Sequence, residues 1–304
     1  MIPERTAQSY GPAITTASKS VLLEVLTTLR SYQGALVLIG GWVPYFLLEQ
    51  HRPAGSRFAH VGSIDIDLAV DPATVQEPEY ATIVELLLAR GYQPVEGRRS
   101  ATPPSSFERT VNSAMTHKPY TIRVDFLAPQ DDAQPARPRH VAVQDGLMAR
   151  KIKGCQAALT HKVSFPLSGR LPEGGEITVP VSMADLVAIL AMKGIVLGER
   201  YREKDAYDIY ALIKHYEGGP RAVADALRPH LADPLIREAV EGIRAAFASR
   251  QAHGPAWAAA FLVHAMFSAE HQRLMTDAFM VVNECLTLLH GAASGRSRSG
   301  SVLE

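Results

Sequence analysis

The stretch Ser63-Ile-Asp-Ile-Asp-Leu-Ala-Val-Asp71 decides our expectation of the fold, because acidic and apolar residues alternate along it. Such alternation predicts a β-strand with one polar face and one buried face. Side chains two positions apart on a strand share a face, so Asp65 and Asp67 are expected side by side. Two neighbouring carboxylates repel each other unless a cation lies between them, and Mg²⁺ prefers oxygen ligands. The stretch therefore predicts a strand that binds Mg²⁺ (or Mn²⁺).

Upstream of this strand, the apolar run 35–41 ends in Gly40 and Gly41 and is followed by a predicted helix over 42–50. A glycine turn between a buried strand and a helix presents bare backbone N–H groups and the positive end of the helix dipole. We therefore expect phosphate oxygens of a nucleotide to bind there.

Downstream, residues 120–128 alternate in the same way and place Asp125 between two apolar residues. If this strand lies beside the first, three carboxylates converge on one point: Asp65, Asp67 and Asp125. A glycine turn for phosphates and three acids for metal ions are the parts needed for metal-assisted nucleotidyl transfer from an NTP.

The order of elements predicts two domains in a chain of 304 residues. Residues 1–181 mix strands and helices, with further helices at 18–31 and 80–91 and short strands near 161–167 and 175–181. Residues 182–290 read as consecutive helices, the first capped by Ser182 with Asp185 in its first turn. Residues 291–304 are polar and predicted to be a disordered tail. The expected class is α+β with a helical C-terminal domain.

Lys plus Arg and Asp plus Glu both total 31, which excludes a uniformly basic protein that coats nucleic acid. The charges are nevertheless segregated: 61–97 carries one base and seven acids (1 − 7 = −6), and 137–170 carries seven bases and one acid (7 − 1 = +6). The basic stretch is a candidate contact for RNA, with a solvated face as the alternative. No secretion signal or membrane span is recognisable, so a cytoplasmic protein without a membrane partner is expected.

Three motifs together resemble the nucleotidyltransferase fold of the DNA polymerase β superfamily: LIGGW at 38–42, SIDIDLAV at 63–70 and RVDFL at 123–127. Lys193 in AILAMKG and the stretch ERYREKDAYDIYALI at 199–213 are similar to the signature of the AbiEii/AbiGii-type nucleotidyltransferases. The likeness covers roughly residues 30–215. It implies a mixed sheet flanked by helices, and a toxin of an abortive-infection or toxin–antitoxin system with a cognate antitoxin. It also implies NMP transfer to an RNA acceptor such as the 3′ end of tRNA.

The resemblance also implies a role for each candidate residue. The implied catalytic residues are Asp65, Asp67, Asp125 and Lys193. The implied nucleotide-binding residues are Gly40, Gly41, Ser63, Lys193, Arg200, Lys204, Asp205 and Asp208. Spacings of 7, 4 and 4 between Lys193, Arg200, Lys204 and Asp208 allow one helix face, or two consecutive helices. A solvated face with salt bridges is the alternative, and for Ser63 we expect a structural role at the start of the strand.

Two features depart from the family pattern. Gly41 and Asp65 are separated by 23 residues, a gap long enough for an inserted loop that could displace the glycine turn. The turn also lacks the serine common among polymerase β relatives. Two alternatives therefore stay open: transfer to a protein or a small molecule such as an aminoglycoside, and a non-catalytic nucleotide-binding protein.

Overall fold

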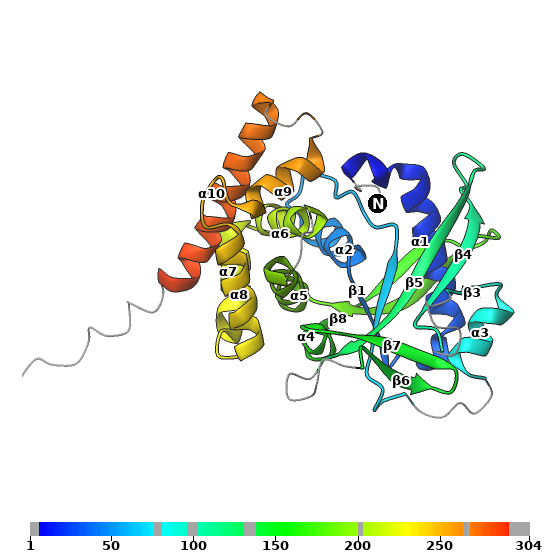
Figure 1. Cartoon of the computed structure of the whole chain (residues 1–304). Coiled ribbons are helices and arrows are strands. Elements are labelled where there is room, and N and C mark those ends of the chain that lie inside the picture. The colour runs from blue at the N-terminus through cyan, green and yellow to red at the C-terminus, as the bar shows by residue number, and fades with distance from the viewer. Residues whose placement is uncertain are drawn as a thin grey trace, which may run out of the picture. The chain divides into compact units, whose positions relative to one another are not determined.

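A computed structural model describes residues 6–75, 81–95, 103–130, 138–199, 203–263, 265 and 268–291 (Figure 1). The chain folds into two compact units. The sheet unit comprises Ala7–Leu47 and His60–Met192, and the helical unit comprises Leu48–Ala59 and the residues from Lys193 onward. The predicted α+β class, with a mixed sheet flanked by helices, is confirmed. The domain limits drawn from the sequence stay predictions.

The sheet unit is built on a mixed sheet whose strand order, within the described residues, is β3-β4-β5-β2-β1-β9-β8, with β7 pairing β5 and β6 pairing β7. Its central strand β2 runs parallel to β5 and antiparallel to β1. The strands predicted around residues 36, 66 and 124 are therefore three neighbours. The bounds are β1 (Leu36–Ile39), β2 (Ile66–Val70), β3 (Gln93–Pro94), β4 (Ser106–Asn112), β5 (Pro119–Pro129), β6 (His140–Gln144), β7 (Leu147–Ile152), β8 (Lys162–Arg170) and β9 (Glu176–Ala184).

Strand alternation separates two faces of the central strands. Ile66 and Leu68 of β2 and Val124 and Phe126 of β5 are fully buried. Burying each such side chain stabilises the fold by about 1.5–3 kcal/mol relative to leaving it exposed. Their alternate neighbours therefore carry the polar chemistry of these strands.

Helices α1 (Pro12–Thr28), α3 (Ile83–Ala89) and α4 (Cys155–Thr160) belong to the sheet unit (Figure 1). Glu24 of α1 is buried, and its Oε2 accepts hydrogen bonds from the Tyr92 hydroxyl (2.8 Å) and from Arg109 Nε (3.3 Å). A buried carboxylate needs such partners, and here they tie α1 to β4. Helix α3 begins with a capping box in which the side chain of Thr82 accepts from the Glu85 N–H and that of Glu85 accepts from the Thr82 N–H.

The helix predicted from Ser182 onward begins later than expected. Ser182 lies inside β9, paired with Ser164 of β8, so its predicted role as a helix cap is wrong. Helix α5 (Leu186–Glu199) begins after Asp185, whose Oδ1 accepts a hydrogen bond from the Ala188 N–H at 2.9 Å. The pairing with β8 extends the strand to Ala184, and the next residue able to cap takes over.

The helical unit contains α6 (Glu203–His215), α7 (Pro220–Leu227), α8 (Pro234–Ala246), α9 (His253–Leu262) and α10 (Ala269–Gly291). Helices α5 and α8 cross where two glycines meet: a Cβ added to Gly194 would lie 2.4 Å from the backbone oxygen of Ala239, and one added to Gly242 would lie 2.4 Å from that of Gly194. The tail predicted at 291–304 lies outside the described residues apart from Gly291. None of the helices described combines the length and the apolar character needed to cross a membrane.

The sequence predicts an inserted loop in the segment between α2 (Trp42–His51) and β2. Residues 52–65 form no helix or strand. Part of the segment belongs to the helical unit, where Phe58 stacks on the His215 ring with 3.7 Å between centroids. Just before the segment, His51 Nδ1 at the end of α2 lies 3.2 Å from Glu217 Oε1. The long segment between Gly41 and Asp65 therefore includes residues that pack against α6.

Candidate functional site

The centre of the candidate site is a pair of aspartates on adjacent strands. Asp67 of β2 is the direct partner of Asp125 in the parallel pairing with β5, and of Ile39 in the antiparallel pairing with β1. Directly paired residues share a sheet face, and neighbouring strands lie about 4.8 Å apart. The predicted meeting of these two carboxylates is thus present in the register of the sheet.

The glycine turn lies against one of these carboxylates. Gly40 follows β1 with φ +73°, and a Cβ added to it would lie 2.1 Å from Asp67 Oδ2. Only glycine avoids both the strained backbone and this collision. The long gap before Asp65 therefore does not displace the turn from the acid pair. Gly41 follows directly, and α2 begins at Trp42, whose ring is buried and stacked on Phe46.

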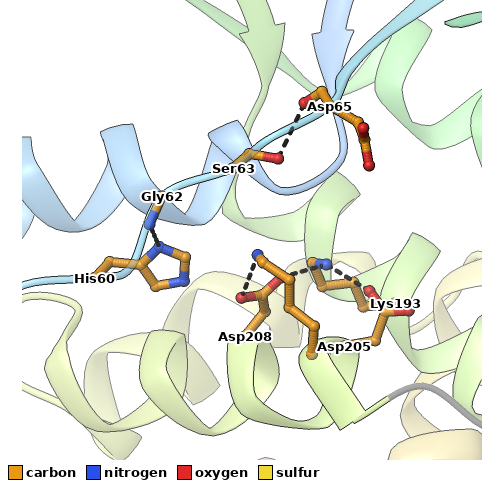
Figure 2. Close-up of polar contacts among 8 residues, drawn as sticks. His60, Gly62, Ser63, Asp65, Lys193, Asp205 and Asp208 are labelled. Carbon is orange, nitrogen blue, oxygen red and sulfur yellow. Dashed lines mark hydrogen bonds and ion pairs between the residues drawn. The ribbon is translucent and has the colours of Figure 1, made fainter. Parts of the chain in front are cut away.

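Asp65 departs from the expected geometry. It lies in a bend immediately before β2, not within the strand, so strand alternation does not decide where its side chain points. The bend is held by two side-chain hydrogen bonds. The Ser63 hydroxyl donates to the Asp65 carbonyl oxygen at 3.0 Å (Figure 2). The buried Ser18 hydroxyl of α1 donates to the Ile64 carbonyl oxygen at 2.8 Å. Ser63 thus makes a structural contact at the start of the strand.

Asp125 is engaged by two residues that sequence reasoning missed. Arg123 Nε donates to Asp125 Oδ1 at 2.8 Å, and a second guanidinium nitrogen donates to the Ser106 hydroxyl at 2.9 Å. The Ser106 hydroxyl donates in turn to Asp125 Oδ1. The sequence Arg123-Val124-Asp125 could have predicted the contact between Arg123 and Asp125, because residues two apart on a strand share a face.

The electrostatics of Arg123 reflect these acids. Partial burial opposes its charged form, yet the hydrogen bond and charge of Asp125, and the charges of Asp65 and Glu108, raise the pKa of the guanidinium. The Asp65 carboxylate is therefore near enough to act on Arg123. The negative potential at this end of β2 and β5 attracts cations.

The donor set can be compared with what a metal ion requires. Across the described part of the chain, no three His, Cys, Asp or Glu side chains gather closely enough to hold a metal ion. Mg²⁺, however, is commonly bound through one or two carboxylates together with substrate phosphates and water. Asp67 and Asp125, in register beside a glycine turn, fit that requirement, and a contribution from Asp65 stays a prediction.

A second polar cluster lies in the helical unit. Lys193 of α5 is buried, and its ammonium lies 2.7 Å from Asp205 Oδ1 and 2.7 Å from Asp208 Oδ2, both of α6 (Figure 2). Lys204 contacts both oxygens of Asp208 at 3.1 Å. Because Asp208 is fully buried and Lys193 only 5% exposed, the solvated-face alternative does not describe this cluster. Arg200 lies outside the described residues.

Burial and ion pairing act in opposite directions on the two lysines. Burial opposes the charged form of Lys193, but the charges and hydrogen bonds of Asp205 and Asp208 prevail and raise its pKa. For Lys204 burial prevails over the attraction of Asp208, and the charge of Lys193 adds to it, so its pKa is lowered. The geometry joins α5 to α6 through Lys193, and a direct role of either lysine in nucleotide binding stays a prediction.

Gly40 offers a direct test of the turn beside Asp67. Gly40→Ala places a methyl group where Asp67 Oδ2 lies and strains a backbone with positive φ, so we expect a loss of about 1–3 kcal/mol in stability. Gly34→Ala is the matched control, because a Cβ there meets no atom within 4 Å. Thermal unfolding of both variants measures the difference. Equal melting temperatures for the two would contradict the contact between Gly40 and Asp67.

The chain was compared with known proteins. No family model matches it, and no curated protein sequence matches it. Among solved structures, the crystal structure of an antigenic nucleotidyltransferase-like protein from Paracoccidioides brasiliensis is similar over 77% of this chain and 94% of that chain, with 13% identity and a TM-score of 0.36. A similarity at that TM-score carries no weight for fold or function, so both rest on the geometry described above.

Proposed function

We propose that this chain is a metal-dependent nucleotidyltransferase that transfers NMP from an NTP to an acceptor and releases pyrophosphate. The observation that carries the proposal is the register of Asp67 with Asp125, with the Gly40 turn packed on Asp67. Two carboxylates aligned beside a strand–glycine–helix turn supply oxygen ligands and backbone phosphate donors at one place.

Each part has a chemical task in this proposal. Asp67 and Asp125 hold Mg²⁺ or Mn²⁺, which when bound polarises phosphate oxygens and lowers the pKa of the attacking hydroxyl. Gly40, Gly41 and the start of α2 orient the triphosphate. The acceptor oxygen forms a bond to the α-phosphorus while the bond from that phosphorus to the pyrophosphate oxygen breaks, and the hydroxyl proton passes to solvent or a nearby base.

A row of basic side chains favours a polyanionic acceptor. Arg150 of β7 pairs with Leu127, two residues after Asp125 and on the same sheet face, and His140 of β6 pairs with Arg150. Burial lowers the pKa of His140, and the charges of Arg150 and Arg139 lower it further. Among the residues that the structure describes, neither arginine forms a salt bridge. Adjacent cations attract phosphates, so we propose an RNA 3′ end, such as that of tRNA, as the acceptor.

The decisive experiment is transfer of label. The protein is incubated with Mg²⁺ or Mn²⁺, each of the four α-³²P-labelled NTPs in turn, and total RNA, and the products are separated by size. We expect labelled RNA of tRNA length. Label in protein or in an added aminoglycoside would redirect the acceptor assignment, whereas nucleotide binding with no transfer to any acceptor would support the non-catalytic alternative.

The basic row gives a second prediction. Replacing Arg139 and Arg150 together by Gln should weaken binding of single-stranded RNA about tenfold and lower the slope of log affinity against log salt by about 2, because two phosphate contacts are lost. The control replaces Lys162 and Arg170 by Gln, which removes the same charge from β8 of the same unit. Fluorescence anisotropy over a salt series measures both. If both double substitutions weaken RNA binding equally, Arg139 and Arg150 have no special role in binding RNA.

The resemblance of the Lys193 and 199–213 motifs extends the proposal to a cytoplasmic toxin held in check by a cognate antitoxin. Induced expression in a bacterial host tests this part separately. Growth arrest by the wild-type chain and normal growth with Asp67→Asn at equal protein level is the expected outcome, and normal growth with both would remove the toxin role while leaving transfer untouched.

A further inference from the structure

Arg123 already occupies the position of a cation at Asp125. Its Nε lies 2.8 Å from Asp125 Oδ1, and its second nitrogen holds the Ser106 hydroxyl that also donates to Oδ1. All of these contacts with Asp125 fall on Oδ1. The proposed metal ligand is therefore bound to a positively charged side chain of the same strand.

The two side chains of this ion pair, Arg123 and Asp125, differ in how far they are buried. The Arg123 side chain is 44% exposed, whereas that of Asp125 is 16% exposed. A long arginine side chain that is nearly half exposed can leave its partner at a smaller packing cost than a buried one. Asp125, in contrast, is fixed by the paired strand and by Ser106. A change at this contact is thus a movement of Arg123 and not of the carboxylate.

The charges explain why a cation is needed there at all. Asp67 and Asp125 lie on neighbouring strands, about 4.8 Å apart by strand spacing, and their repulsion destabilises the sheet unless a positive charge offsets it. Arg123 supplies that charge from the same face. Asp65 also acts on Arg123, so the guanidinium lies in the same field that attracts a divalent cation.

We propose that Arg123 is a placeholder cation: its guanidinium neutralises Asp125 in the resting protein and competes with the divalent cation for that carboxylate. The inference rests on the proposed function, because it takes Asp125 to be a metal ligand. Arg123 is then a positioning residue. It offsets the repulsion between the two carboxylates without metal and sets the metal concentration at which the site is loaded.

The test measures Mn²⁺ binding by electron paramagnetic resonance, with no nucleotide present. Arg123→Gln keeps a hydrogen-bond donor for Asp125 and removes the charge, so it should tighten Mn²⁺ binding about tenfold. Arg123→Lys keeps the charge and should retain the wild-type affinity. Lys162→Gln, which removes one charge elsewhere in the sheet unit, should also bind as the wild type does. Unchanged affinity in Arg123→Gln overturns the proposal.

A double-mutant cycle separates direct competition from a diffuse charge effect. In an Asp125→Asn background, Arg123→Gln should leave the Mn²⁺ affinity unchanged, because the contested carboxylate is gone. The same tightening in both backgrounds means that Arg123 acts only as a distant charge, which overturns the placeholder role. Asp67→Asn separates this inference from the proposed function. If the wild type does not bind Mn²⁺, or if Asp67→Asn binds it as tightly as the wild type, the proposed metal site is wrong and the placeholder role of Arg123 is lost with it.

Thermal unfolding supplies an independent readout and shows that the variant folds. Without metal, Arg123→Gln should melt below the wild type, because the two carboxylates then repel each other without an offsetting charge. Saturating Mn²⁺ should raise the melting temperature of Arg123→Gln more than that of the wild type. Equal increases in the two proteins contradict competition at Asp125.

Discussion

Asp67→Asn is expected to lower the rate of NMP transfer at least about 10³-fold while leaving the protein folded. The substitution keeps the size and shape of the side chain, and an amide still fits beside Gly40, but it removes one of the two charges that are proposed to hold the metal. Because Asp67 and Asp125 are direct partners in the sheet, the loss also relieves their repulsion. The melting temperature without metal should therefore stay equal or rise.

The matched control is Asp71→Asn, four residues later and beyond the end of β2. Asp71 Oδ1 accepts a hydrogen bond from the Ala73 N–H at 3.0 Å, and an asparagine oxygen can accept the same bond. Transfer by this variant should match the wild type. Initial rates with labelled NTP and the best RNA acceptor measure both variants. Activity of Asp67→Asn within tenfold of the wild type would falsify the assignment of Asp67 as a metal ligand.

The acid pair could be predicted from sequence because it depends on a local rule. Alternation with period two identified the strands around Asp67 and Asp125, and the apolar residues between the acids are buried as expected. What alternation could not show is where a strand ends. Asp65 continues the pattern in sequence, but two hydrogen bonds hold a bend there: one from Ser18 to Ile64, 46 residues apart, and one from Ser63 to Asp65. The partner on α1 is a tertiary contact that no local pattern encodes.

The same limit explains the two other differences. Ser182 has the residue type of a helix cap, yet pairing with β8 from 18 residues upstream keeps it in a strand. The strands β3, β4, β6 and β7 were not predicted, because they are held by pairing with β5 and with one another. Buried side chains such as Phe107 of β4 and Leu147 of β7 do not by themselves identify a strand. Arg123 differs from these, because its place two residues before Asp125 on an alternating strand was readable from the sequence.

The lysine cluster shows how far spacing alone can be taken. Spacings of 11 and 4 allow Lys193, Lys204 and Asp208 to share a helix face or to lie on two consecutive helices, and a solvated face was the alternative. The choice depended on burial: α5 and α6 enclose the cluster, and Asp208 has no exposed surface. Burial is a property of the packed helices, so only the structure could decide it.

Lys193→Met is expected to destabilise the protein by about 3–5 kcal/mol, because it leaves Asp205 and the fully buried Asp208 without the charge that pairs with both. Adding Asp208→Asn should restore part of the loss, since a neutral amide is less costly to bury than an unbalanced carboxylate. Urea unfolding of the wild type and both variants measures the three free energies. A loss below about 1 kcal/mol would mean that Lys204 alone satisfies Asp208.

The contribution of Lys193 to the free energy of unfolding should depend on pH in a definite direction. The ion pairs raise the pKa of Lys193 above its ordinary value of 10.5, and a group whose pKa is raised on folding stabilises the folded state fully below its ordinary pKa. That contribution is lost only as the pH rises through the raised value. The difference in unfolding free energy between wild type and Lys193→Met should therefore be constant from about pH 6 to 9, and shrink only in strongly alkaline solution. A difference that already falls within that neutral range would show that Lys193 is not held charged by its two aspartates.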